Sequence, residues 1–143
     1  MDEQWDERAV VGYAGDVDPS DAYFGLQSDV DAVLVDVRTS AEWSYVGLPD
    51  LLQIGKRVFF IEWQRFPDGA LNGSFVEQLR EAGVREGASI HLLCRSGVRS
   101  AVAARAATAA GLGPACNISD GFEVQLGNDG HRTLTGWKAI GLH

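Results

Sequence analysis

The residues best suited to chemistry form a short segment that begins at Cys94. The sequence Cys94-Arg-Ser-Gly-Val-Arg-Ser100 follows an apolar run over residues 89–93 and leads into an alanine-rich stretch, residues 98–110. We expect a buried strand, a tight loop and a helix, with Cys94 at the carboxyl end of the strand, where open α/β sheets place their ligand sites. A cysteine is nucleophilic only as the thiolate, and a helix N-terminus stabilises that anion. The segment therefore predicts a reactive cysteine.

The charge around Cys94 is opposite to that of the whole chain. The chain has a formal net charge of −8, yet residues 89–117 contain three arginines and neither Asp nor Glu. Arg95 and Arg99 lie within the loop, and Gly97 allows successive backbone N–H groups to turn inward and form a concave anion site. An anionic substrate is therefore expected.

This loop resembles the active-site loop of the rhodanese-like sulfurtransferases, in which the cysteine carries a persulfide. The match is Cys-x-x-Gly-x-Arg-Ser at a strand-to-helix turn, and the resemblance runs from about Asp18 to Leu142. It departs from the family between Val46 and Gly69, where the usual Gly-His-Ile-Pro-Gly-Ala stretch is replaced. Further similar motifs are Asp36-Val37-Arg38, Glu42-Trp43, Asp120-Gly121 and Gly136-Trp137…Gly141.

The resemblance implies a single-domain sulfurtransferase with a thiosulfate-like anion as donor and a thiol or cyanide as acceptor. Cys94 would attack the outer sulfur of the donor, hold it as a persulfide and pass it on, without a metal or organic cofactor. We expect Asp36 to accept hydrogen bonds from the loop arginines, and Arg38 to have a similar supporting role. The substrate-binding loop would consist of Arg95, Ser96, Gly97, Val98, Arg99 and Ser100.

Two other functions remain open at this point. Cysteine-dependent phosphatases and arsenate reductases use similar loops, but their signature places an arginine six residues after the cysteine. Here Arg99 is five residues after Cys94, and the sixth position is Ser100. The second alternative is a non-catalytic rhodanese-like binding module, a role that often accompanies loss of the cysteine.

The order of elements predicts an α/β fold with a parallel sheet and helices on both faces, and the resemblance implies a sheet of about five strands. Residues 1–17 are expected to be a lead-in and residues 18–143 the rhodanese-like domain. Expected strands cover residues 31–36, 56–62, 89–93 and 115–118. Helices are expected to begin at Asp18, at Thr39, at Asn72 and at Val98.

Composition argues against several partners. The acidic net charge disfavours nucleic acid, and no apolar run is long enough to span a membrane. The acidic N-terminus lacks the pattern of a signal peptide, and Cys94 and Cys116 form neither a disulfide framework nor a metal pattern. We therefore expect a cytoplasmic protein in which Cys116 is structural.

Overall fold

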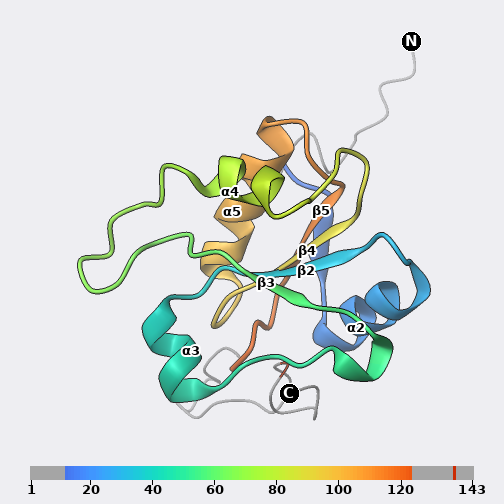
Figure 1. Ribbon diagram of the computed structural model, residues 1–143, viewed down its shortest axis with the longest axis horizontal. Coiled ribbons are helices and arrows are strands. Elements are labelled where there is room, and N and C mark those ends of the chain that lie inside the picture. The colour runs from blue at the N-terminus through green and yellow to red at the C-terminus, as the bar shows by residue number, and fades with distance from the viewer. Residues whose placement is uncertain (1–11, 124–136, 138–143) are drawn as a thin grey trace.

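The fold is an α/β sandwich built on one five-stranded parallel sheet, as the sequence predicts (Figure 1). The computed structural model describes residues 12–123 and residue 137. Every strand pairing is parallel, so all carboxyl ends of the strands lie at one edge. The strand order is β1 (Gly15–Val17), β5 (Ala115–Ile118), β4 (Ile90–Leu93), β2 (Val33–Asp36) and β3 (Val58–Phe60).

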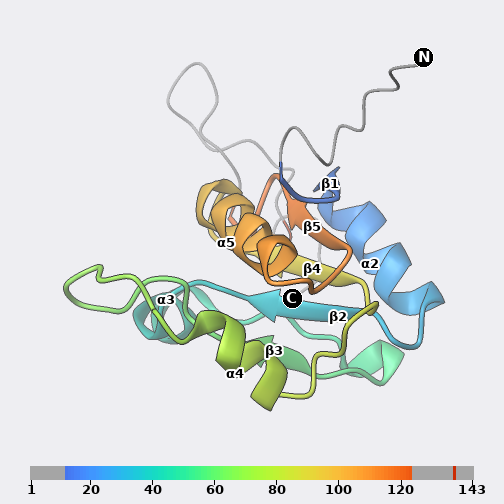
Figure 2. The same ribbon diagram turned by 90° about the horizontal axis from the view of Figure 1, so that it is seen from above.

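Helices cover both faces of the sheet (Figure 2). On one face, α4 (Phe75–Glu81) and α5 (Val98–Ala109) bury Phe75, Leu79 and a row of alanines against the strands. On the other face, α2 (Pro19–Ser28) contributes Ala22 and Leu26 to a second cluster. Two shorter elements, α3 (Ser40–Val46) and the 3-10 helix η1 (Leu52–Ile54), connect β2 to β3.

Strand β4 lies in the middle of the sheet, and its side chains alternate between the two clusters. Ile90 and Leu92 pack in the cluster with α4 and α5, whereas Leu93 packs in the cluster with α2. Cys94 follows Leu92 by two residues and therefore belongs to the α5 side. Because side chains alternate along the strand, the Cys94 thiol lies on the α5 side of the sheet, at the N-terminus of α5.

The helix starts follow ordinary capping chemistry. The Asp18 carboxylate accepts a hydrogen bond from the Asp21 backbone N–H, and Pro19 occupies the first turn, as predicted for α2. Thr39 and Glu42 form a reciprocal capping box at the start of α3, which fixes the Glu42 side chain close to the end of β2.

The structure corrects three details of the sequence prediction. Strand β1 was not predicted, and it brings the last three residues of the expected lead-in into the sheet beside β5. Strand β3 is shorter than the expected strand over residues 56–62. The N-cap of α4 is Ser74, while the Asn72 carboxamide accepts a hydrogen bond from the Ser74 N–H.

Some expectations fall outside the described residues. These include residues 1–11 of the lead-in and, in the closing motif, Gly136 and Gly141; Trp137 of the same motif is fully buried. Within residues 12–123, no helix is long and apolar enough to cross a membrane.

Candidate active site

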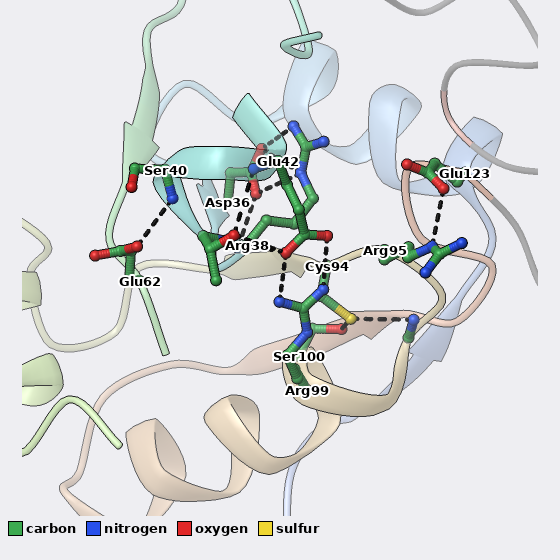
Figure 3. A network of polar contacts seen from close by, with 12 residues as sticks. Asp36, Arg38, Ser40, Glu42, Glu62, Cys94, Arg95, Arg99, Ser100 and Glu123 are labelled. Atoms are coloured by element: carbon green, nitrogen blue, oxygen red, sulfur yellow. Dashed lines mark hydrogen bonds and ion pairs between the residues drawn. The ribbon is translucent and has the colours of Figure 1, made fainter. Parts of the chain in front are cut away.

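Cys94 lies immediately after β4, and its sulfur is held by the beginning of α5 (Figure 3). The Gly97 backbone N–H donates a hydrogen bond to Sγ at 3.1 Å, and the Ser100 hydroxyl oxygen also lies 3.1 Å from Sγ. The side chain is only 1% exposed. The sulfur thus lies at the positive end of the α5 helix dipole, with the Gly97 N–H directed at it.

The loop has this shape because two glycines allow backbone to pack on backbone. Gly97 has φ of +98°, and a Cβ atom there would overlap with the Ser119 carbonyl group. Gly121 has φ of +65°, and a Cβ atom there would overlap with the Arg95 carbonyl group. The Phe122 N–H donates to the Cys94 carbonyl oxygen at 2.8 Å. The chain after β5 therefore clamps the loop.

Arg99 is engaged in a bidentate ion pair with Glu42 of α3. Its Nη1 and Nη2 atoms donate to the two carboxylate oxygens at 2.6 and 2.8 Å. Burial by itself would raise the pKa of Glu42, but the hydrogen bonds from Arg99 and Thr39 outweigh it, so the pKa lies below its usual value. The hydrogen bonds that Arg99 makes with Glu42 raise the pKa of Arg99. This pair ties the loop to α3.

Arg95 is also paired, although it is more accessible. Its Nε donates to Glu123 at 2.9 Å, and half of the Arg95 side chain remains exposed. The positive charge that residues 89–117 carry along the sequence is therefore balanced within the fold. Residues 89–117 contain no acid, but folding brings Glu42 and Glu123 to the two loop arginines from other parts of the chain.

Asp36 pairs with Arg38 instead of a loop arginine. Arg38 Nε donates to both oxygens of the Asp36 carboxylate, at 3.0 and 3.1 Å, and Nη2 donates to one of them at 2.8 Å. Both side chains are fully buried. Asp36 is two residues after Leu34, which packs in the α2 cluster, and Arg38 lies over the Phe122 ring of that cluster. The prediction that Asp36 accepts hydrogen bonds from the loop arginines is therefore wrong.

The pair Asp36–Arg38 supports the site from the other side of the sheet. Arg38 Nη2 also donates to the Gly47 carbonyl oxygen at 2.8 Å, which holds the end of α3 in place. The guanidinium therefore joins the end of β2 to the C-terminal end of α3, the helix from which Glu42 reaches the loop.

Ser96 and Val98 complete the predicted substrate-binding loop. Ser96 is partly buried, and Val98 is exposed at the first position of α5. Among the residues that contact the loop, the sequence did not identify Glu123, Phe122 and Asn117. The Asn117 Nδ2 atom donates to the Gly97 carbonyl oxygen at 3.1 Å. A polar side chain within an otherwise apolar strand was the signal that could have identified Asn117.

Comparison with known proteins places this arrangement in a family. The model of the rhodanese-like domain matches residues 20–125. The chain belongs to the rhodanese-like domain family. That span includes Cys94, both loop arginines and Glu42, and it excludes β1.

Uncharacterised relatives match most of the chain. An uncharacterised protein of Rickettsia conorii, RC0915, is 43% identical over 122 residues, which are 85% of this chain and 89% of the relative. The uncharacterised protein RP600 of Rickettsia prowazekii is 40% identical over 122 residues, with the same coverage of both chains.

Solved structures agree with the observed fold. The crystal structure of Rv0390 from M. tuberculosis matches with a TM-score of 0.81 and 48% identity, covering 91% of this chain and 96% of that one. The polysulfide-sulfur transferase homodimer of Wolinella succinogenes matches with a TM-score of 0.57 and 24% identity, covering 80% and 77%. The second match supports the rhodanese-like fold alone.

The ion pair between Glu42 and Arg99 generates a stability prediction. Because the pKa of Glu42 is lower in the folded state, its carboxylate stabilises the fold at neutral pH, and this contribution is lost as the pH falls below about 4.5. Glu42→Gln should reduce the free energy of unfolding by about 1–2 kcal/mol at neutral pH. Urea unfolding across a pH series measures this difference, which should shrink in acid.

The matched control is Glu77→Gln, because Glu77 also lies in the first turn of a helix but is exposed. It should leave the free energy of unfolding nearly unchanged. A Glu42→Gln protein as stable as the parent at neutral pH would contradict the bracing role of the pair.

Proposed function

We propose that this protein is a sulfurtransferase that carries sulfane sulfur as a persulfide on Cys94. The observation that carries the proposal is the environment of Sγ: the Gly97 N–H and the Ser100 hydroxyl contact the sulfur at the N-terminus of α5. Membership of the rhodanese-like domain family supports the same proposal. These groups suit a sulfur that is an anion when it reacts.

The proposed reaction has two displacement steps. In the first, the Cys94 thiolate attacks the outer sulfur of thiosulfate; a sulfur–sulfur bond forms at Cys94, the bond within thiosulfate breaks, and sulfite leaves with the electron pair. In the second, cyanide or a thiolate attacks the outer persulfide sulfur, and the Cys94 thiolate leaves. Thiocyanate or an acceptor persulfide is the product, and no net oxidation of the protein occurs.

The two loop arginines have different proposed roles. Arg99 is occupied by both oxygens of Glu42 and acts as a brace for the loop. Arg95 makes a single hydrogen bond with Glu123 and is half exposed, so it is better placed to attract the oxygens of thiosulfate and the departing sulfite. The anion contact is therefore assigned to Arg95.

Two observations favour sulfur transfer over phosphoryl chemistry. Cys94 is 1% exposed, which suits the transfer of a single atom better than the approach of a tetrahedral phosphate ester. The sixth position after the cysteine, an arginine in the phosphatase signature, is Ser100, whose hydroxyl lies 3.1 Å from Sγ.

Both cysteines are free, and a reducing compartment such as the cytoplasm would keep Cys94 available.

Replacement of each cysteine tests the assignment. Cys94→Ser should abolish thiosulfate:cyanide sulfurtransfer, because a hydroxyl is a weak nucleophile and cannot hold a persulfide. Cys116→Ser should retain activity, since Cys116 lies in β5 and burial raises the pKa of its thiol. Thiocyanate formation measures both. Turnover that survives in Cys94→Ser would contradict the proposal, and an inactive parent would favour the binding-module alternative.

Replacement of Arg95 tests the donor contact. Arg95→Ala should raise KM for thiosulfate about three- to tenfold, the effect of losing a solvent-screened charge contact, while Arg95→Lys should retain part of the affinity. Arg85→Ala is the control, because Arg85 is exposed and precedes β4 at the opposite edge of the sheet. Unchanged KM in Arg95→Ala would exclude Arg95 as the donor contact.

A further inference from the structure

A chain of side-chain hydrogen bonds runs from β1, the outermost strand of the sheet, to the reactive sulfur. Asn117 Nδ2 donates to the Asp16 carboxylate of β1 at 3.0 Å, and the Asn117 side-chain oxygen is hydrogen-bonded to the Ser100 hydroxyl. The Ser100 oxygen in turn lies 3.1 Å from Cys94 Sγ. Ser100 is fully buried, and Asn117 is 4% exposed.

The orientation of the Asn117 carboxamide is determined by its partners. Its nitrogen faces two acceptors, the Asp16 carboxylate and the Gly97 carbonyl oxygen. An inverted amide would place an oxygen against both of these acceptors and lose both hydrogen bonds. The side-chain oxygen of Asn117 must therefore face Ser100.

Proton counting then determines the direction of the Ser100 hydroxyl. The carboxamide oxygen can only accept, so the single hydroxyl proton of Ser100 points to Asn117. Ser100 consequently presents a lone pair to Cys94. A neutral thiol can donate its S–H to that lone pair, whereas a thiolate or persulfide anion needs a donor in the same place.

We propose that Asn117 is a positioning residue that acts on Cys94 through Ser100. In the resting protein, Asn117 holds the Ser100 hydroxyl away from the sulfur and thereby favours the protonated thiol. When the sulfur becomes an anion, the hydroxyl turns to donate to it, and the Asn117 oxygen loses this donor. The inference rests on the proposed function in taking Cys94 as the reacting group.

This arrangement gives Ser100 and Asn117 opposite effects on the same thiol. Ser100 supplies a hydrogen bond to the anion, so removal of its hydroxyl disfavours the thiolate. Asn117 competes for that hydrogen bond, so removal of its oxygen favours the thiolate. A purely structural role in loop packing would not produce opposite signs at two neighbouring buried residues.

The test measures thiolate content without any sulfur donor, in a Cys116→Ser background that leaves Cys94 as the single thiol. Readouts at neutral pH are the ultraviolet absorbance of the thiolate and the rate of alkylation by iodoacetamide. Ser100→Ala should slow alkylation about ten- to a hundredfold, the effect of losing a hydrogen bond to an anion. Ser100→Thr, which retains the hydroxyl, should recover part of the rate.

The opposite result is expected for Asn117→Leu, a variant of similar size without the acceptor. Its thiolate absorbance should increase and its alkylation should be about two- to tenfold faster, the effect of one neutral hydrogen bond. Asp16 is exposed and accepts a hydrogen bond from the Tyr13 hydroxyl at 2.8 Å, so this variant does not leave it without a donor. Asn117→Ala should change in the same direction, and circular dichroism verifies that both variants are folded.

The double variant shows whether Asn117 acts through Ser100. In a Ser100→Ala background, Asn117→Leu should have no further effect on thiolate absorbance. Lower or unchanged absorbance in folded Asn117→Leu or Asn117→Ala would overturn the inference, as would an equal gain in the Ser100→Ala background. Persulfide formation from thiosulfate, measured by mass on the same samples, tests the proposed function separately, so the two failures are distinguishable.

Discussion

The close packing of backbone between the Cys94 loop and residues 119–121 is the constraint on which the site depends. Gly97 and Gly121 both have positive φ, and at each position a Cβ atom would overlap with a carbonyl group of the facing segment. This contact holds the start of α5 against the end of β5. It places the Gly97 N–H at Sγ and brings Asn117 close enough to contact both Gly97 and Ser100.

Charge balance is the second feature that organises the site. Arg38, Arg95 and Arg99 each have a carboxylate partner: Asp36, Glu123 and Glu42, respectively. The pairs of Arg99 and Arg95 tie α3 and the segment after β5 to the loop, and Arg38 ties the end of β2 to the end of α3. These pairs leave little uncompensated cationic charge near the thiol. A sulfur anion would therefore be stabilised mainly by the Gly97 N–H, and by the Ser100 hydroxyl once it turns away from Asn117.

The sequence predicted the parts of this site that depend on neighbours along the chain. Strand β4, the loop and α5 are contiguous, and their apolar run, glycine and alanines are local signals. Strand β1 was missed because it has three residues, two of them Gly15 and Asp16, and it is defined only by pairing with β5, about 100 residues away. The same limitation applies to the pair of Arg99 with Glu42, which are 57 residues apart.

The misassignment of Asp36 has a different cause. Its position at the end of β2 suggested proximity to the loop, which is correct, but the alternation of side chains along the strand directs it to the α2 side. There, the nearby Arg38 satisfies it. A correct prediction requires knowing which residues of β2 face each of the two cores. That is known only once the structure shows which faces of the sheet α2 and α5 cover.

Intact-mass measurement of the parent protein after incubation with thiosulfate is the most direct test of a persulfide on Cys94. We predict a gain of one sulfur atom, located on the peptide containing Cys94 and removed by cyanide. No gain in mass, or a gain located on Cys116, would contradict it.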